Sequence, residues 1–351
     1  MSQALTSSPG IHVSVSYSRQ NDYVQEFQAL EVPKFEVDTF STTFEGLTKS
    51  LQIPRLRRQF KAFLVNSDVD IIYCPMWHPW NSSMLRFIRK KKIPYVLTVH
   101  DAVRHLGDSG RIQRWVEGYE QRRADAFIAL SQHAKSQLDS RGKQPPFGTT
   151  IIPHAPFYYM QPTRVGNHDQ GALKLLFIGR IRPYKGLDTL LEAFDQVLQS
   201  SHSDVSLTIA GSGDLKPYES QLAKLHRIHL RNKWLSDTEF GELLHGHDAL
   251  VLPYLEASQS GVIAAAQGAG KPVIAFAVGG ISEQITHGVD GLLAVDRTPA
   301  GLAQELLLLA NNQHLLAELQ EGAKNRSSGE STWASSAESV VQLCRSILSS
   351  R

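Results

Sequence analysis

The sequence predicts an α/β protein made of two doubly wound domains, and three observations lead to this fold class. Its 351 residues exceed the roughly 250–300 at which a single hydrophobic core stops growing. Short apolar runs alternate with helical patterns, which is typical of βαβ units and parallel sheets. The segment Tyr158–Gly171 is polar, contains proline and glycine and has no periodicity, so it is the best linker candidate.

The candidate strands of the first half begin with Ile11–Tyr17, whose odd-numbered residues are apolar and alternate onto one face. The other strands expected in this half are Asp70–Cys74, Pro94–Val99, Ala126–Leu130 and Thr149–Ile152. Those expected in the second half are Leu173–Ile178, Val205–Ala210, Ile228–Leu230, Ala249–Pro253 and Pro272–Phe276.

Between the first two strands of the second half lies an amphipathic helix, with Leu190, Phe194 and Val197 on its apolar face. A helix rich in small residues follows over Val262–Gly268, and a last helix is expected over about Thr332–Ser349. We therefore expect domains over residues 1–165 and 166–331. The final helix over residues 332–351 would be able to cross back to the first domain.

The composition is that of an ordinary soluble protein, with 42% hydrophobic and 20% charged residues. No run approaches the roughly 20 apolar residues of a membrane span, and the polar start MSQALTSSPG does not resemble a signal peptide. The two cysteines, Cys74 and Cys344, match no metal-ligand spacing. We therefore expect a reduced, cytoplasmic protein.

The formal net charge of +2 conceals an uneven distribution. Residues 1–165 contain 21 Lys and Arg against 14 Asp and Glu, whereas residues 166–351 contain 15 against 20. The halves either meet different partners or differ only in their solvated faces. An anionic membrane surface or a lipid diphosphate is one candidate partner of the basic half. Nucleic acid is not expected, because the chain is near neutral and carries no recognisable module.

Two cationic helical stretches account for much of the basic half. The first contains Arg55, Arg57, Arg58 and Lys61. The second ends in Arg86, Arg89, Lys90, Lys91 and Lys92. Cations are favourable at a helix C-terminus in any case, so this pattern alone does not choose between a membrane and a solvated face.

The block Phe177–Gly186 (FIGRIRPYKG) is the most informative motif of the chain. An apolar strand runs into Gly179, three cations follow, and Gly186 precedes the amphipathic helix. Glycine lets a phosphate approach the backbone, and Arg and Lys neutralise its charge. The alternative is an ordinary strand–turn–helix with solvated cations. The block is neither a Walker loop nor a GxGxxG dinucleotide motif.

A second block, Pro253–Glu283, ends a strand and opens a helix after the polar residues Ser258–Gly261. The free N–H groups and the positive end of such a helix favour binding of a diphosphate. The alternative is a serine-capped core helix without a ligand, which has the same sequence pattern. In a third block an apolar strand delivers His100 and Asp101 to its carboxyl end, where open α/β sheets bind ligands.

Taken in order, these motifs resemble glycosyltransferase family 4. The resemblance rests on Gly179-Arg180 with Lys185-Gly186, on AGSGDL (Ala210–Leu215), and on the SQSGV helix start followed by GKPVIA and GG…E. It is strong over about residues 173–295 and continues through HDAVRHLG, RRADAFIALS and IIPHAPF. It implies the GT-B fold, in which two Rossmann-like domains face each other across a cleft. It also implies a retaining enzyme that uses a nucleotide-sugar donor.

The resemblance implies roles for individual residues. Arg180 and Lys185, beside Gly179, would hold the donor diphosphate and stabilise the leaving nucleoside diphosphate. Backbone amides around Ser260, Gly261 and Val262 would bind the distal phosphate and the sugar, and His100 would project towards the sugar from the first domain. The base would lie near Asn232, Lys233 and Trp234. The catalytic set would therefore be His100, Arg180 and Lys185.

Two features depart from the family pattern. Its pair of glutamates is incomplete, because Glu256 lies near the first position but the second falls at Ala264 or Ala265. Glu283 stays a structural or sugar-contact candidate. The loop after the first strand lacks the usual glycine pair, so Ser18, Arg19 and Gln20 would face the cleft instead.

The sequence thus predicts sugar transfer from a nucleotide-sugar to a hydroxyl of a glycan or lipid-linked glycan in surface polysaccharide biosynthesis. The first domain would bind the acceptor and the second the donor, with no cofactor and no metal. The protein would be cytoplasmic and could associate peripherally with the inner face of the membrane. Two other functions stay open: a non-catalytic GT-B subunit that binds a nucleotide-sugar, and a GT-B sugar-nucleotide epimerase.

Overall fold

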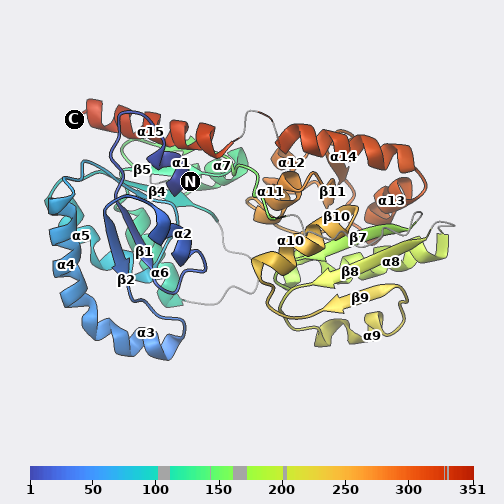
Figure 1. The fold of residues 1–351 in the computed structure, drawn as a ribbon. Helices are drawn as coiled ribbons and strands as arrows, with labels where there is room; N and C mark the ends of the chain where they lie inside the picture. Colours follow the sequence, from blue (N-terminus) through green and yellow to red (C-terminus); the bar gives the residue numbers. More distant parts are fainter. Residues whose placement is uncertain (102–110, 143, 161–171, 201–203, 328, 330–331) are drawn as a thin grey trace.

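The computed structural model of the chain describes residues 1–101, 111–142, 144–160, 172–200, 204–327, 329 and 332–351. Its strands form two lobes of parallel sheet flanked by helices (Figure 1). The predicted α/β class with two doubly wound domains is confirmed. Most of the predicted linker and the limits predicted for the domains fall on or beside residues outside this description, so those limits stay predictions.

The N-terminal lobe holds two parallel sheets. One pairs β1 (Val15–Ser18) with β2 (Lys34–Val37), and the other has the order β3-β4-β5-β6. The strands of this second sheet are β3 (Ile72–Cys74), β4 (Tyr95–Val99), β5 (Ala126–Ala129) and β6 (Thr149–Ile151). Asp101 and Ser131, which follow the carboxyl ends of β4 and β5, reach the C-terminal lobe.

The first strand begins four residues later than the alternation predicted. The ladder of β1 starts where Val15 pairs with Lys34, because the preceding Pro33 has no N–H to donate and contributes only its carbonyl to Val15. The partner strand β2 was not predicted, since its four residues, Lys-Phe-Glu-Val, are half charged. A short strand of this kind has no signal of its own in the sequence.

Helices cover both faces of the N-terminal lobe. They are α1 (Ser2–Thr6), α2 (Val24–Ala29), α3 (Thr43–Lys49), η1 (Ser50–Gln52), α4 (Ile53–Asn66), η2 (Pro79–Ser83), α5 (Leu85–Lys90), α6 (Arg111–Gln121) and α7 (Gln132–Asp139). The final helix, α15 (Trp333–Ser349), lies over this lobe and not over the one that precedes it in sequence (Figure 1). Its Val340 and Ile347 are buried in one cluster with Val96, Ala126 and Ile128 of the sheet.

The C-terminal lobe contains one parallel sheet of six strands in the order β12-β11-β10-β7-β8-β9. The strands are β7 (Leu173–Ile178), β8 (Val205–Ala210), β9 (Ile228–Arg231), β10 (Ala249–Leu252), β11 (Val273–Phe276) and β12 (Gly291–Ala294). The chain builds outwards from β7 in one direction and then from β10 in the other. Ligands of such sheets bind where the order reverses, at the carboxyl ends of the two central strands.

The helices of the C-terminal lobe pack on both faces of this sheet. They are η3 (Pro183–Lys185), α8 (Leu187–Ser200), η4 (Lys216–Tyr218), α9 (Glu219–Leu222), α10 (Asp237–Gly246), α11 (Gly261–Gly268), α12 (Ile281–Gln284), α13 (Pro299–Ala310) and α14 (Gln313–Ser327). The predicted apolar face of α8 is buried, with Leu190, Phe194 and Val197 at 0% exposure. Each such side chain stabilises the fold by about 1.5–3 kcal/mol. Among the described helices, none is both long enough and apolar enough to cross a membrane.

Gly186 joins η3 to α8 and gives the first testable prediction. Its φ is +68°, and a Cβ there would lie 2.0 Å from the carbonyl oxygen of Pro253. Gly142 has a similar φ of +74° but nothing within 4 Å of an added Cβ. We expect Gly142→Ala to lower the free energy of unfolding by about 1–2 kcal/mol, the cost of left-handed backbone alone. We expect Gly186→Ala to lower it by about 3 kcal/mol, because overlap adds to that cost. Urea denaturation measures both, and equal losses would contradict the close approach to Pro253.

Candidate active site

A pocket of about 370 Å³ lies where the strand order of the six-stranded sheet reverses. It receives residues from the turn after β7, from the loop between β10 and α11, from α10 and from the chain that leaves the N-terminal lobe. The lining residues are Asp101, Phe157, Tyr159, Tyr184, Lys185, Phe240, Tyr254, Ala257, Gln259, Ser260, Gly261 and Val262. Four of the predicted site residues, Lys185, Ser260, Gly261 and Val262, are therefore brought together.

The turn after β7 places the predicted cations at the edge of this pocket. Gly179 has a φ of +128°, and a Cβ at this position would lie 3.8 Å from Cγ2 of Val262, so the turn and the start of α11 are neighbours. Arg180 is exposed and does not line the pocket. Its charge is nevertheless near enough to contribute to lowering the pKa of Lys185.

Lys185 is the cation that the fold places inside the pocket. Its Nζ lies 3.8 Å from the ring centroid of the fully buried Tyr254 and 5.5 Å from that of Tyr184. Burial, helped by the charge of Arg180 and opposed by Tyr184 and Asp101, lowers the pKa of Lys185 to about 8. Aromatic faces attract a cation but do not replace its hydration. An anion bound in the pocket would further favour the charged form of Lys185, in addition to Asp101.

The start of α11 offers the pocket the positive end of a helix. Gly261 and Val262 lie in the first turn, where N–H groups have no partner within the helix. The Ser260 amide is engaged, however, because its N–H donates to Oε1 of Gln284 at 2.7 Å. Of the three amides that the sequence indicated, the structure thus leaves Gly261 and Val262 as the candidates for an anion.

His100 does not line the pocket, whereas its neighbour Asp101 does. Nε2 of His100 lies 2.8 Å from the carbonyl oxygen of Pro75, and its ring centroid lies 5.9 Å from that of His154. Burial, with a smaller effect of His100, lowers the pKa of His154 to about 4, so His154 is neutral near pH 7. The catalytic role of His100 stays a prediction. Residues 102–110, which continue this motif, lie outside the described part of the chain.

The predicted base-binding residues and Glu256 also lie outside the pocket lining. Asn232 bonds the backbone of Gly213 in both directions at 3.1 Å, Lys233 forms an ion pair with Glu239, and Trp234 is 70% exposed. In their place, Phe240 of α10 reaches the pocket and its ring lies 4.8 Å from that of Tyr159. The part of Asn232, Lys233 and Trp234 in binding the base stays a prediction.

Sequence reasoning missed the aromatic character of the site. The lining contains Phe157, Tyr159, Tyr184, Phe240 and Tyr254. Tyr184 and Tyr254 lie inside the two motif blocks and could have been singled out there. Phe157 ends the motif IIPHAPF, which carried part of the resemblance but was given no role in the site. Tyr159 lies in the predicted linker and Phe240 in α10, and no sequence signal connects these two with the site.

The two lobes meet at the start of α7. Glu283 accepts hydrogen bonds from the amides of Gln132 and His133, at 2.6 and 2.8 Å, and so caps a helix of the opposite lobe. Beside it, Oγ of Ser131 donates to the carbonyl of Ser258 at 2.7 Å and is buried. Glu283, which the sequence left as a structural or sugar-contact candidate, does not line the pocket and performs this structural task.

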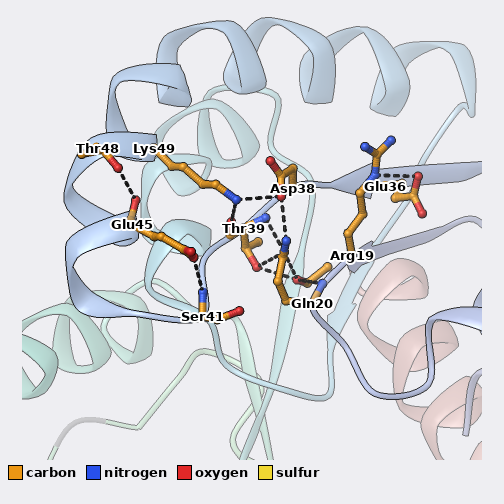
Figure 2. A network of polar contacts seen from close by, with 10 residues as sticks. Arg19, Gln20, Glu36, Asp38, Thr39, Ser41, Glu45, Thr48 and Lys49 are labelled. Atoms are coloured by element: carbon orange, nitrogen blue, oxygen red, sulfur yellow. Dashed lines mark hydrogen bonds and ion pairs between the residues drawn. The ribbon is translucent and has the colours of Figure 1, made fainter.

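The loop after β1 belongs to a polar network at the carboxyl ends of β1 and β2 (Figure 2). Gln20 donates to Asp38 and accepts from the amide of Thr39, both at 2.7 Å. Arg19 pairs with Glu36 at 2.9 Å. The polar groups of Arg19 and Gln20 thus bond β2 and the two residues that follow it, and the expectation that this loop faces the cleft stays a prediction.

Comparison with known proteins agrees with this architecture. Residues 172–312 match the family model "Glycosyl transferases group 1", and residues 1–155 match "Glycosyltransferase Family 4". The glycogen synthase of Mycobacterium tuberculosis is 27% identical over 286 residues, which cover 78% of this chain and 68% of that protein. A D-inositol 3-phosphate glycosyltransferase of Frankia alni is 35% identical over 199 residues, which cover 53% of this chain and 48% of that protein.

Among solved structures, Anabaena Alr3699/HepE in complex with UDP and glucose superposes with a TM-score of 0.74 at 18% identity, over 95% of this chain and 91% of that one. The fold is therefore that of a GT-B glycosyltransferase. The chain belongs to the family 4 type of these enzymes, as its motifs indicated, and is a glycosyltransferase.

The joint between the lobes gives the second prediction. Removal of the Glu283 carboxylate leaves two amides of α7 without their acceptor, so Glu283→Ala should cost about 1–2 kcal/mol locally. Hydrogen exchange of the Gln132 and His133 amides should accelerate by roughly tenfold. Glu321→Ala is the matched control, because Glu321 pairs only loosely with Lys324, at 4.0 Å on the surface. Unchanged exchange in Glu283→Ala would mean that other contacts hold the lobes.

Proposed function

We propose that the protein transfers a sugar, with retention of configuration, from a nucleotide-sugar to a hydroxyl group of a glycan or lipid-linked glycan. The observation that carries the proposal is that Lys185 and the first turn of α11 meet in one pocket at the reversal of the strand order. A half-buried cation and a helix N-terminus together favour a diphosphate. Retention and a role in surface polysaccharide synthesis follow from the sequence resemblance.

The chemistry assigns each group a task. The bond between the anomeric carbon and the diphosphate oxygen breaks, the acceptor oxygen bonds to that carbon, and the hydroxyl proton leaves with the diphosphate. Lys185 and the amides of Gly261 and Val262 stabilise the charge that grows on the departing diphosphate, and the exposed Arg180 adds long-range support. UDP and glucose occupy the Anabaena relative, so UDP is the first nucleotide to test.

The acceptor is assigned to the N-terminal lobe, whose Asp101 is the one carboxylate in the described lining of the pocket. We assign Asp101 the orientation of the acceptor hydroxyl. His100 would act beside it, held through Pro75. Closure of the two lobes would exclude water from the reacting carbon.

The first test of this function compares two cations of one turn. Lys185→Ala should weaken UDP binding by roughly 10- to 100-fold, as charge-assisted hydrogen bonds are lost. Arg182→Ala is the matched control, because Arg182 is exposed and does not line the pocket. In the unaltered protein, affinity should fall by up to about tenfold per pH unit above about 8, where Lys185 loses its proton.

In Lys185→Ala that pH dependence should disappear. Isothermal titration calorimetry between pH 7 and 10 measures both effects. Equal losses in the Lys185 and Arg182 variants would contradict a diphosphate at Lys185.

A further test separates His100 from Asp101. We expect Asp101→Asn to lower kcat by about 100-fold, because a group that orients the acceptor hydroxyl is lost. His100→Ala should lower kcat by about tenfold through displacement of Asp101, and neither change should alter UDP binding. Turnover of a nucleotide-sugar with a soluble acceptor provides the measurement, and normal turnover in His100→Ala would remove His100 from the site.

Two rival functions are distinguished by incubation with the donor alone. Slow hydrolysis that is lost in Lys185→Ala would exclude a non-catalytic subunit, whereas an epimerised nucleotide-sugar would replace the transferase by an epimerase. Metal independence is also proposed. No group of three or more potential ligands occurs in the described part of the chain, and turnover in the presence of a chelator tests this point directly.

We also propose that the protein is cytoplasmic and associates with the inner, anionic face of the membrane through the basic N-terminal half. Exposed cations of α4 and α5, among them Arg58, Arg89 and Lys90, support this proposal. Electrostatic attraction of this kind brings the protein to a lipid-linked acceptor but does not fix its orientation.

A further inference from the structure

Helix α3 and the adjoining η1 carry their apolar side chains on the outside. Phe44, Leu47 and Leu51 are 76, 75 and 86% exposed. Their spacing of three and four residues places them on one side of a helical segment. Surface helices of globular proteins normally bury such a stripe against the core. Here the stripe faces outwards.

The polar and small residues of α3 occupy its inner side. Gly46 lies against Phe40, with a would-be Cβ 3.1 Å from that ring. Lys49 donates to Asp38 at 2.9 Å and to the carbonyl of Thr39 at 2.7 Å (Figure 2). Glu45 accepts from the amide of Ser41 at 3.0 Å. These contacts fix the rotation of α3, so exposure of the stripe is a property of the fold.

A cationic surface adjoins the stripe. Arg55, Arg58 and Lys61 are exposed on α4, which continues directly from η1. Nζ of Lys61 lies 5.0 Å above the ring of Phe87, and this contact joins α4 to α5. The exposed cations on α5 and directly after it are Arg86, Arg89, Lys90, Lys91 and Lys92. Helices α4 and α5 lie side by side on the edge of the N-terminal lobe remote from the C-terminal lobe (Figure 1).

We propose that the α3–η1 stripe inserts into the interfacial layer of an anionic bilayer, while the cations of α4 and α5 contact the lipid headgroups. An apolar stripe bordered by Arg and Lys is the pattern of helices that lie in a membrane interface. A second copy of the chain is a poorer occupant, because a symmetric contact through this surface would bring like cations together.

The location of the stripe connects it with the proposed acceptor. Lys49 ties α3 to Asp38 and Thr39, which directly follow the carboxyl end of β2. That edge of the N-terminal lobe is the side to which we assign the acceptor. The inference therefore extends the proposed function, on which the identity of a lipid-linked acceptor rests. Membrane insertion itself is measured without any sugar transfer.

The test compares matched apolar substitutions on the two lobes. The triple variant Phe44→Ser, Leu47→Ser, Leu51→Ser should bind vesicles of phosphatidylcholine and phosphatidylglycerol at least about tenfold more weakly in co-sedimentation. Val295→Ser with Leu308→Ser, at 83 and 48% exposure on the C-terminal lobe, should leave binding unchanged. Unaltered melting temperature and UDP affinity would show that the triple variant is folded.

A second readout reports the depth of the stripe. A tryptophan in Phe44→Trp should shift its emission to the blue with anionic vesicles and be quenched by brominated lipid. The variant Arg55→Gln, Arg58→Gln, Lys61→Gln should lose most of its dependence on phosphatidylglycerol. Equal vesicle binding by the triple serine variant and the unaltered protein would overturn the inference. So would a dimer in sedimentation that the serine variant abolishes. Vesicle binding with no turnover on any nucleotide-sugar would refute the proposed function and leave the inference standing.

Discussion

The site depends on one feature of the chain path, the reversal of strand order between β7 and β10. Because all six strands are parallel, their carboxyl ends share an edge, and connections from β7 and β10 leave that edge towards opposite faces of the sheet. The loops that carry Lys185 and Gly261 therefore diverge and leave a pocket between them. Close backbone approach at Gly186, against the carbonyl of Pro253, keeps these two loops in register. Without the reversal of strand order, the Lys185 side chain and the amides at the start of α11 would not meet in one pocket.

The pocket also depends on how the N-terminal lobe is held against the C-terminal lobe. Phe157 donates its amide to the carbonyl of Ala264, and a Cβ at Gly268 would lie 2.0 Å from the carbonyl of Phe157, so the connecting chain runs directly along α11. The small residues of α11 allow this approach. Ala264 and Ala265, which stand where the family has its second glutamate, are buried beneath it. Loss of that glutamate is thus accompanied by close packing of the connecting chain on α11. Glu283, in turn, joins the lobes at α7.

Polar contacts also fix the orientation of α3 in the N-terminal lobe. The network around Gln20, Asp38 and Lys49 satisfies the carboxyl ends of β1 and β2, and the same contacts rotate α3 so that its apolar residues face outwards. The pocket of the C-terminal lobe, as the proposed donor site, and the apolar, cationic surface of the N-terminal lobe would together suit a transferase that acts on a lipid-linked acceptor. The excess of basic residues in residues 1–165 thereby gains a specific location on α4 and α5.

The sequence alone determined the C-terminal lobe well, because buried parallel strands such as Leu173–Ile178 and Val205–Ala210 are continuous apolar runs that need no partner to be recognised. It also identified Lys185 and the start of α11, since glycine and cation spacing are local properties. Strands β2 and β12 were not predicted, because two of the four residues of β2 are charged and β12 contains a glycine and an alanine, which are depleted in strands. Only the tertiary structure decided that Asp101 and not His100 lines the pocket, that aromatic residues from four segments enclose it, and that α3 turns its apolar side outwards. Local pattern specifies which residues form an element. Which side of that element is buried depends on partners outside the element, such as Phe40 and Asp38 for α3, and no periodicity within the element contains that information.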